Sequence, residues 1–402
     1  MSEIDPSRIA GGPADDAELQ LSLVDGDPLH RAQRALGLIP ARGLGLARRA
    51  LLLALLTWVP VAVWAFVQGR LLPGAAGEPL LQHFGIHVRC LIAIPLLVLA
   101  EGMARGVTTR LVPYFLTSGL IREQDRDAFR GVIRDVIRLR DSTRPWVVIL
   151  AIVIAWAWLS PVAGDVHEIV WTDPESAPDR IGFGGYWFLY VARPVYFALM
   201  MSWLWRVVLL FVLLRRISKL DLDLVPSHPD GVFGIAFVEG LPACFSLVVL
   251  SGSAVLASRW SHDVIYHGVH VDTLRVPSVA FLVVSLVLFT GPLLAFLPKL
   301  AATRRRALLQ YGALVGEQGR LVGRKWIASD PSVSSDLLSA PEIGPVADAI
   351  SLYDAVARSR TIPIGKRSVI AIAIPAALPL LAVFAIEVPV KELLLKLLTT
   401  LA

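Results

Sequence analysis

Two long apolar runs joined by a short polar link constrain this chain more than any other feature. They cover residues 186–214 and 233–257, and each exceeds the roughly 20 residues that a helix needs to cross the hydrocarbon core of a membrane. Five more apolar runs lie at residues 51–67, 85–104, 146–162, 279–297 and 368–386. The sequence therefore predicts an all-α, polytopic membrane helix bundle with about seven spans.

Composition agrees with a membrane protein and argues against a nucleic-acid partner. Hydrophobic residues make up 55% of the chain and the mean hydropathy is +0.64, well above the apolar share of soluble domains. The formal charge is +5, but the arginines lie mainly between the apolar runs. Membrane topology explains such a distribution, so no nucleic-acid binding is expected.

The distribution of Lys and Arg predicts the orientation. Basic residues gather before residue 51 and at 105–144, 215–219 and 299–366. The alternate connections hold few: Arg70, Arg180, Arg259 and Arg275. Because basic loops stay in the cytoplasm, we expect a cytoplasmic N-terminus and a periplasmic C-terminus.

The chain divides into six expected parts. These are a disordered N-terminus (1–27), an interfacial helix (28–50), a membrane domain with spans 1–6 (51–297) that includes a cytoplasmic helical insert (105–144), a cytoplasmic helical segment (298–367), span 7 (368–387) and an interfacial C-terminal helix (388–402). The assignments rest on apolar periodicity. The last part is assigned to the interface because its apolar run is too short to span the membrane.

The insert at 105–144 carries arginines four residues apart, a spacing that places them on one face of a helix. They are Arg122, Arg126, Arg130, Arg134 and Arg138. Asp127 and Asp135 are spaced to pair with Arg130 and Arg138 at i,i+3. We expect a solvated helix face near anionic lipid or, alternatively, a docking surface for another protein.

Five charged residues fall inside predicted spans, where an ionised group costs several kcal/mol. They are Arg89, Arg193, Arg206, Glu101 and Glu239. The predicted topology puts Arg89 and Arg193 in the outer half of the membrane and both glutamates near its inner side, whereas Arg206 fits either depth. These groups either pair and reach toward lipid head groups, or line a polar pathway that favours anions. A pathway requires facing side chains, which makes a homo-oligomer plausible.

The link between the two longest runs is the densest polar cluster of the chain. Asp221, Asp223, His228 and Asp230 could bind a divalent cation or act as acid and base. The alternative is local structure, in which Asp230 or Ser227 caps the next helix and the aspartates offset neighbouring basic residues.

The loop after the fifth run holds three histidines, His262, His267 and His270. Imidazoles can bind zinc or copper and titrate near neutral pH, but these spacings match no sharp metal signature. The motifs G-x-x-x-x-G-K-[ST], H-E-x-x-H and G-x-S-x-G do not occur. No cofactor is expected.

Four stretches carry a resemblance to known proteins. They read G-L-I-P-A-R-G-L-G-L-A-R-R-A-L-L-L-A-L-L-T-W-V-P, H-V-R-C-L-I-A-I-P-L-L-V-L-A-E, L-D-L-D-L-V-P-S-H-P-D-G and A-D-A-I-S-L-Y-D-A-V-A-R-S-R-T-I-P-I. Together they resemble a group of uncharacterised bacterial multi-spanning inner-membrane proteins, over most of the chain beyond about residue 28. The resemblance implies no activity, but it adds His87 to the polar residues of interest. Similar proteins tend to have Gly-Gly after His-Pro-Asp-x, whereas this chain reads Gly-Val-Phe-Gly.

Three functional interpretations remain open. The first is a channel or transporter for small ions, with a weak preference for anions, whose partners are membrane lipids, a second copy of the chain and a small ion or solute. The second is a membrane-embedded enzyme that acts on lipid head groups through His228 and its aspartates. The third is a membrane scaffold or signalling protein.

Overall fold

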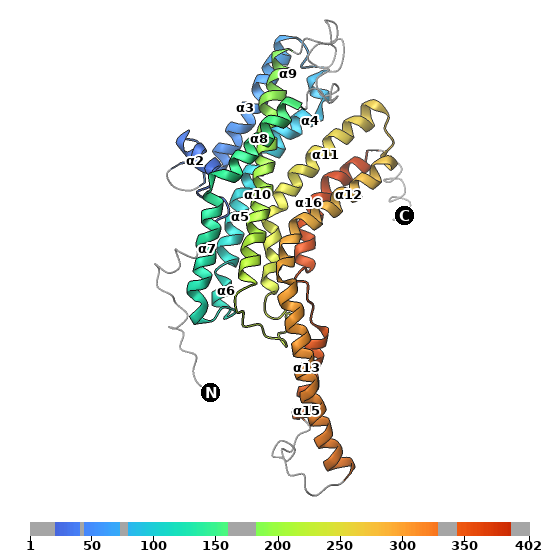
Figure 1. Cartoon of the computed structure of the whole chain (residues 1–402). Coiled ribbons are helices and arrows are strands. Elements are labelled where there is room, and N and C mark those ends of the chain that lie inside the picture. Colours follow the sequence, from blue (N-terminus) through green and yellow to red (C-terminus); the bar gives the residue numbers. More distant parts are fainter. Residues whose placement is uncertain (1–20, 41–43, 73–78, 160–181, 329–343, 387–402) are drawn as a thin grey trace, which may run out of the picture.

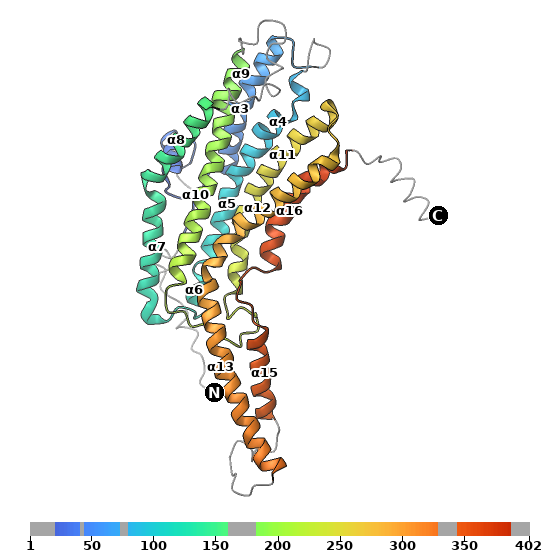
Figure 2. The same ribbon diagram turned by 45° about the vertical axis from the view of Figure 1, so that its right-hand side comes forward.

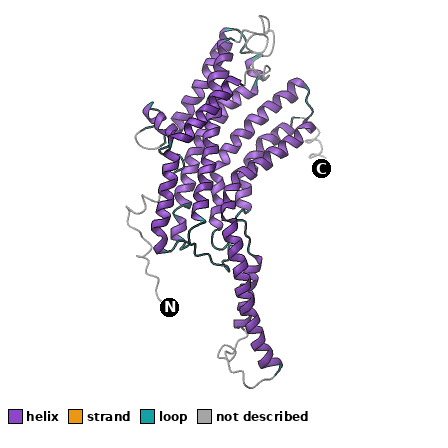
Figure 3. Ribbon diagram, viewed as in Figure 1, coloured by secondary structure: helices purple, strands orange, loops and turns teal. Residues whose placement is uncertain are grey.

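The computed structural model describes residues 21–40, 44–72, 79–159, 182–328 and 344–386. Within these ranges the regular structure is helical, apart from one isolated bridge between Ile121 and Leu222 (Figure 3). Seven helical stretches are long and apolar enough to cross a membrane. They are Leu46–Val67, Phe84–Thr117, Glu123–Leu159, Phe183–Ile217, Ala236–His267, Val271–Val322 and Lys366–Phe384. The predicted polytopic helix bundle is confirmed.

The elements follow one another along the chain with few long loops (Figure 1). The first half contains α2 (Pro28–Ala35), α3 (Leu46–Val67), η2 (Leu80–Gln82), α4 (Phe84–His87), η3 (Val88–Ala93), α5 (Ile94–Leu111), α6 (Tyr114–Thr117), η4 (Glu123–Asp125), α7 (Arg126–Asp141) and α8 (Thr143–Leu159). The second half contains α9 (Phe183–Trp187), η7 (Phe188–Ala192), α10 (Arg193–Ile217), η8 (Ala236–Phe245), α11 (Ser246–His267), η9 (Val271–Leu274), α12 (Arg275–Thr290), η10 (Gly291–Phe296), α13 (Leu297–Val322), η11 (Gly323–Ile327), α15 (Gly344–Arg358) and α16 (Lys366–Phe384).

The centre of the bundle packs around Trp203 of α10, which is fully buried. Its indole N–H donates to the backbone carbonyl of Leu97 on α5 at 3.0 Å, and its ring meets that of Phe245 edge to face. A buried indole needs such an acceptor, so this contact sets α10 against α5 while satisfying the polar atom.

An apolar belt on the outside of the bundle marks the surface that faces lipid. Large exposed apolar side chains follow one another along α3, α8, α12 and α16, where a soluble protein would carry polar groups. At one end, the belt stops at Leu51 on α3 and at Met103 on α5. Arg105, two residues further along α5, pairs with Asp25 in the solvent-accessible region beyond the belt.

A helical hairpin projects from that same end, which we call the α13 end (Figures 1 and 2). The 26 residues of α13 extend over about 39 Å at 1.5 Å per residue. Helix α15 packs beside α13, and residues 359–365 return the chain to the bundle at the start of α16. The hairpin lies in the segment 298–367 that was expected to be helical and cytoplasmic.

Four of the non-α-helical stretches within the spanning helices lie at or beside a proline. The segments η3 and η7 are π-helical, and each precedes a proline, Pro95 or Pro194, near the start of an α-helix. The segments η8 and η10 are 3₁₀-helical and contain Pro242 and Pro292. Proline cannot donate to the preceding turn, so the helix changes its winding around it. At ten residues, η8 is unusually long for a 3₁₀-helix.

The N-terminal region differs from the expectation at residues 21–27. Leu21, Leu23 and Val24 are almost completely buried, although residues 1–27 were expected to be mobile. The expected interfacial helix at 28–50 consists of α2, a connection that includes Gly45 in the left-handed region (φ 58°), and the first turn of α3. The expected interfacial helix at 388–402 lies outside the described residues.

Candidate functional site

The charged residues of the spans fall into three separate groups. Arg206 and Glu101 form one group with two partners that sequence analysis did not single out, Arg49 and Asp27. Glu239 belongs to a second group at the α13 end, and Arg89 and Arg193 form the third. The five residues therefore do not line one continuous row.

The first group is a buried ion-pair network. The Glu101 carboxylate pairs with Arg49 at 2.5 Å and with Arg206 at 3.3 Å, and Arg206 also pairs with Asp27 at 3.0 Å. Each of the four side chains is at most 2% exposed. Two cations balance two anions, which makes burial tolerable, and removal of one partner would leave an uncompensated charge. The pairing places Arg206 at the level of Glu101, next to the end of the apolar belt.

Arg89 and Arg193 lie far along the bundle from this network. Arg89 precedes Glu101 by 12 residues, about 18 Å along a helix, and its guanidinium stacks over Phe188 with 5.4 Å to the ring centroid. Arg193 stacks over Trp156 at 4.9 Å. Such cation–π contacts stabilise arginine in a desolvated setting.

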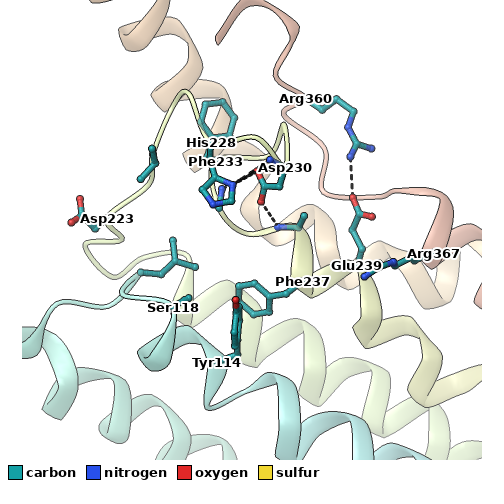
Figure 4. A pocket seen from close by; sticks show the side chains of 14 residues that line it. Tyr114, Ser118, Asp223, His228, Asp230, Phe233, Phe237, Glu239, Arg360 and Arg367 are labelled. Carbon is teal, nitrogen blue, oxygen red and sulfur yellow. Dashed lines mark hydrogen bonds and ion pairs between the residues drawn. The ribbon is translucent and has the colours of Figure 1, made fainter. Parts of the chain in front are cut away.

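A cavity of about 510 Å³ opens at the α13 end, beside the loop 218–235 (Figure 4). Its lining combines aromatic, acidic and basic side chains: Tyr114, Phe233, Phe237, Asp223, Asp230, Glu239, His228, Arg360 and Arg367. These residues come from α6, the loop, the start of η8, the segment before α16 and the first turn of α16. The cavity is thus built where the hairpin joins the membrane domain.

One wall of the cavity is a turn organised by Asp230. Its carboxylate accepts backbone hydrogen bonds from Val232 at 2.8 Å, Gly234 at 3.1 Å and Ala236 at 3.0 Å, and lies 3.0 Å from Nδ1 of His228. Burial alone would raise the pKa of Asp230, but these donors outweigh it and hold the pKa below its usual range. Asp230 therefore organises this turn through its backbone hydrogen bonds.

The same turn contains backbone conformations that normally require glycine. Gly231 and Gly234 have φ angles of 68° and 92°, and Phe233 between them has a φ of 62°. A non-glycine residue in this region costs of order 1–3 kcal/mol, and the surrounding structure must hold it there.

The second wall is closed by an ion pair between the bundle and the return segment. Arg360 donates to the Glu239 carboxylate at 3.1 Å, and its backbone N–H donates to the Gly231 carbonyl at 2.8 Å. The Glu239 side chain is 10% exposed. Gly365 leaves room for it, because a Cβ at that position would overlap the carboxylate, and Ser368 donates to the backbone carbonyl of Glu239 at 2.8 Å.

The other members of the predicted polar cluster lie apart from this wall. Asp221 and Asp223 each accept from Arg122 at 3.4 Å, so they offset a residue of the arginine series. His87 lies in α4, where Trp58 donates to its Nδ1 at 2.9 Å and its Nε2 is 3.0 Å from the Leu80 carbonyl. These two contacts satisfy both ring nitrogens.

The arginine series forms the i,i+3 pairs that its spacing predicted. Arg130 pairs with Asp127 at 3.1 Å and Arg138 with Asp135 at 3.6 Å. Asp135 also accepts from Arg216 of α10 at 2.6 Å. These contacts confirm the predicted pairs, which are largely exposed to solvent.

The predicted histidine loop is largely helical: His262 and His267 lie on α11, which continues to His267, and only His270 follows it. His262 is buried and its ring stacks on His83, with ring centroids 5.1 Å apart, while His267 and His270 are exposed. No group of three or more His, Cys, Asp or Glu side chains suited to a metal ion occurs in the part of the chain that the structure describes.

Comparisons with models of protein families, with curated proteins and with solved structures found no match to this chain. The geometry of the cavity and of its ion pair therefore carries the functional interpretation.

Proposed function

We propose that this protein is a membrane channel or transporter for small ions or solutes, with a preference for anions, and that the cavity at the α13 end is the entrance to its pathway. The observation that carries the proposal is the position of Glu239. This glutamate borders the cavity, lies on the ten-residue 3₁₀ segment η8 and pairs with Arg360 of the return segment.

The Glu239–Arg360 pair has the arrangement of a gate. It connects two parts of the chain, η8 in the bundle and the segment before α16, across the inner wall of the cavity. Arg360 is half exposed, so water competes for its guanidinium and the pair is weaker than a buried one. A long 3₁₀ stretch in a spanning helix often marks a hinge, because its hydrogen bonds are poorer than those of an α-helix.

The remaining charged groups have other roles in this proposal. The buried network of Arg49, Glu101, Arg206 and Asp27 holds the bundle and the N-terminal segment together. Arg89 and Arg193 would contribute positive potential farther along the pathway, which would favour anions. In this proposal the protein lies in a bacterial inner membrane, the cavity opens to the cytoplasm, and the protein forms a homo-oligomer.

Flux in proteoliposomes tests the proposal. Purified protein would be reconstituted and assayed with a panel of inorganic anions, organic anions and cations. Glu239→Gln and Arg360→Gln are each expected to change the flux severalfold, and the charge exchange Glu239→Arg with Arg360→Glu is expected to restore it partly. Arg358→Gln, on exposed α15, is the matched control. Flux no greater than that of empty liposomes for every solute would overturn the proposal.

A second candidate function, an enzyme acting on lipid head groups, is favoured by the geometry of His228 and Asp230. A carboxylate 3.0 Å from Nδ1 orients an imidazole so that its Nε2 can accept a proton from a nucleophile. The imidazole borders the cavity. Mass spectrometry of bacterial phospholipids incubated with the protein and with His228→Ala tests this function, and identical lipid profiles for both would exclude it.

A further inference from the structure

The acidic groups of the cavity each have a partner within the protein. Asp230 accepts three backbone N–H groups, Glu239 pairs with Arg360, and Asp223 pairs with Arg122. Asp230 therefore has little acceptor capacity left for a cationic ligand, and the charges of Asp223 and Glu239 are each offset by an arginine.

The side of the cavity formed by residues 360–367 carries an excess of positive charge. Two guanidinium groups, those of Arg360 and Arg367, line this side together with one carboxylate, that of Glu239, which pairs with Arg360 (Figure 4). Arg360 uses its donors on Glu239 and on the Ile364 carbonyl. Arg367 has no hydrogen-bond or ion-pair partner among the described residues, so its planar set of donors is available to a carboxylate or phosphate.

The floor of the cavity is apolar and rigid. Tyr114 of α6 and Phe237 of η8 meet edge to face with ring centroids 4.8 Å apart, and Phe115 packs against the other side of Phe237 at the same distance. Aromatic floors of this kind take up the apolar body of a ligand. A hydrated inorganic ion would make no use of such a surface.

We propose that the cavity binds a small organic anion, with its carboxylate or phosphate on Arg367 and its apolar body on Tyr114 and Phe237. The inference rests on the proposed transport function, since it names the class of solute that enters the pathway. The volume of about 510 Å³ lies within the range of sites for small organic ligands. The Nε2 atom of His228 offers a further polar contact on the opposite wall.

Direct binding to detergent-purified protein tests the proposal. Isothermal titration with benzoate, phenyl phosphate, benzylammonium and chloride separates the contribution of charge from that of the apolar body. Benzoate or phenyl phosphate is expected to bind at least tenfold more tightly than benzylammonium and chloride. Arg367→Gln should weaken binding of the anion about tenfold or more, Arg367→Lys less, and Arg358→Gln not at all. Arg367 is exposed, so these variants are expected to fold.

Binding measured in nanodiscs distinguishes a soluble anion from a lipid head group as the natural ligand of the cavity. Radiolabelled benzoate that stays bound in discs of anionic phospholipid indicates a soluble anion, whereas benzoate retained in zwitterionic discs but lost in anionic ones indicates a lipid head group. Equal affinity of benzoate and benzylammonium, or unchanged binding to Arg367→Gln, would overturn the inference. Binding that depends on Arg367 without any flux overturns only the transport function, and flux without such binding overturns only the assignment of the solute.

Discussion

Asp27 and Arg206 lie 179 residues apart in the chain and form an ion pair of 3.0 Å in which both side chains are buried. The other carboxylate oxygen of Asp27 accepts the backbone N–H of His30 at 2.6 Å and so caps α2. One side chain thus starts a helix outside the spans and ties it to the centre of the bundle. The segment before the first span is therefore part of the folded membrane domain.

Two substitutions at Asp27 separate these roles. Asp27→Asn keeps an oxygen for the cap but removes the charge that faces Arg206, and we expect it to lower stability by about 1–3 kcal/mol. Asp27→Ala also removes the cap and should cost about 0.5–2 kcal/mol more. Thermal unfolding in detergent measures both values. Limited trypsin digestion at Arg31 and Arg34 reports release of α2, and equal stability of both variants and the parent protein would contradict the double role.

Glu101 is the acid on which the two buried arginines converge. Glu101→Gln keeps the shape of the side chain but leaves Arg49 without its ion-pair partner and Arg206 with Asp27 alone. We expect a loss of about 3–5 kcal/mol, the range for a broken buried ion pair. The control is Glu317→Gln on the exposed hairpin, which should change stability by less than about 0.5 kcal/mol. Similar unfolding temperatures for the two variants would exclude a stabilising network.

Acid should weaken the attachment of α2 through His30. This side chain is buried, and burial lowers its pKa below the ordinary value of 6.5, even though Asp25, Asp27 and Glu101 oppose that shift. The unfolded chain then binds a proton more readily than the folded chain. The contribution to stability is complete above about pH 6.5 and is lost as the pH falls below it.

Unfolding temperatures at pH 7.5 and 5.5 measure this dependence. His30→Gln should reduce the difference between the two pH values, while His270→Gln, at an exposed position, should leave it as in the parent protein. If the difference between the two unfolding temperatures is the same in His30→Gln as in the parent protein, the acid sensitivity comes from other groups.

Gly365 controls the space available to Glu239. Its φ of −110° and ψ of −175° suit any residue, so the effect of Gly365→Ala is steric. The new methyl group should displace the Glu239 carboxylate from Arg360 and cost about 1–3 kcal/mol. In a Glu239→Ala background the clash is absent, and the cost should fall by about 0.5–3 kcal/mol. Gly319→Ala, in an open position on α13, is the control, and equal costs in both backgrounds would disprove the contact.

Apolar run length was enough to predict the fold class and the seven spans, because a membrane requires long apolar helices. It was not enough to place the helix ends. The helical stretch through α5 continues to Thr117, well beyond the apolar run that ends near residue 104. The polar turns around Arg105 and Arg110 are still helical because α5 packs there against η8 and α10. Hydropathy does not record such packing contacts.

Partners of the charged residues could not be predicted, because they come from distant or weakly patterned segments. Glu101 and Glu239 were recognised as unusual in a span, but Arg49 looked like an ordinary boundary arginine and Asp27 fell in a stretch expected to be mobile. Arg360 lies in a connection without periodicity. The i,i+3 pairs of α7 were predictable, since the helix itself brings those residues together.

The 3₁₀ geometry of η8 makes this segment longer than an α-helix of the same ten residues. Ten residues occupy about 20 Å as a 3₁₀-helix and about 15 Å as an α-helix. Glu239 lies six residues before the end of η8, so rewinding the segment would draw it along the bundle axis by about 3 Å, enough to break its hydrogen bond to Arg360. A change of helical pitch in one span would in this way break the ion pair that joins the return segment to the bundle.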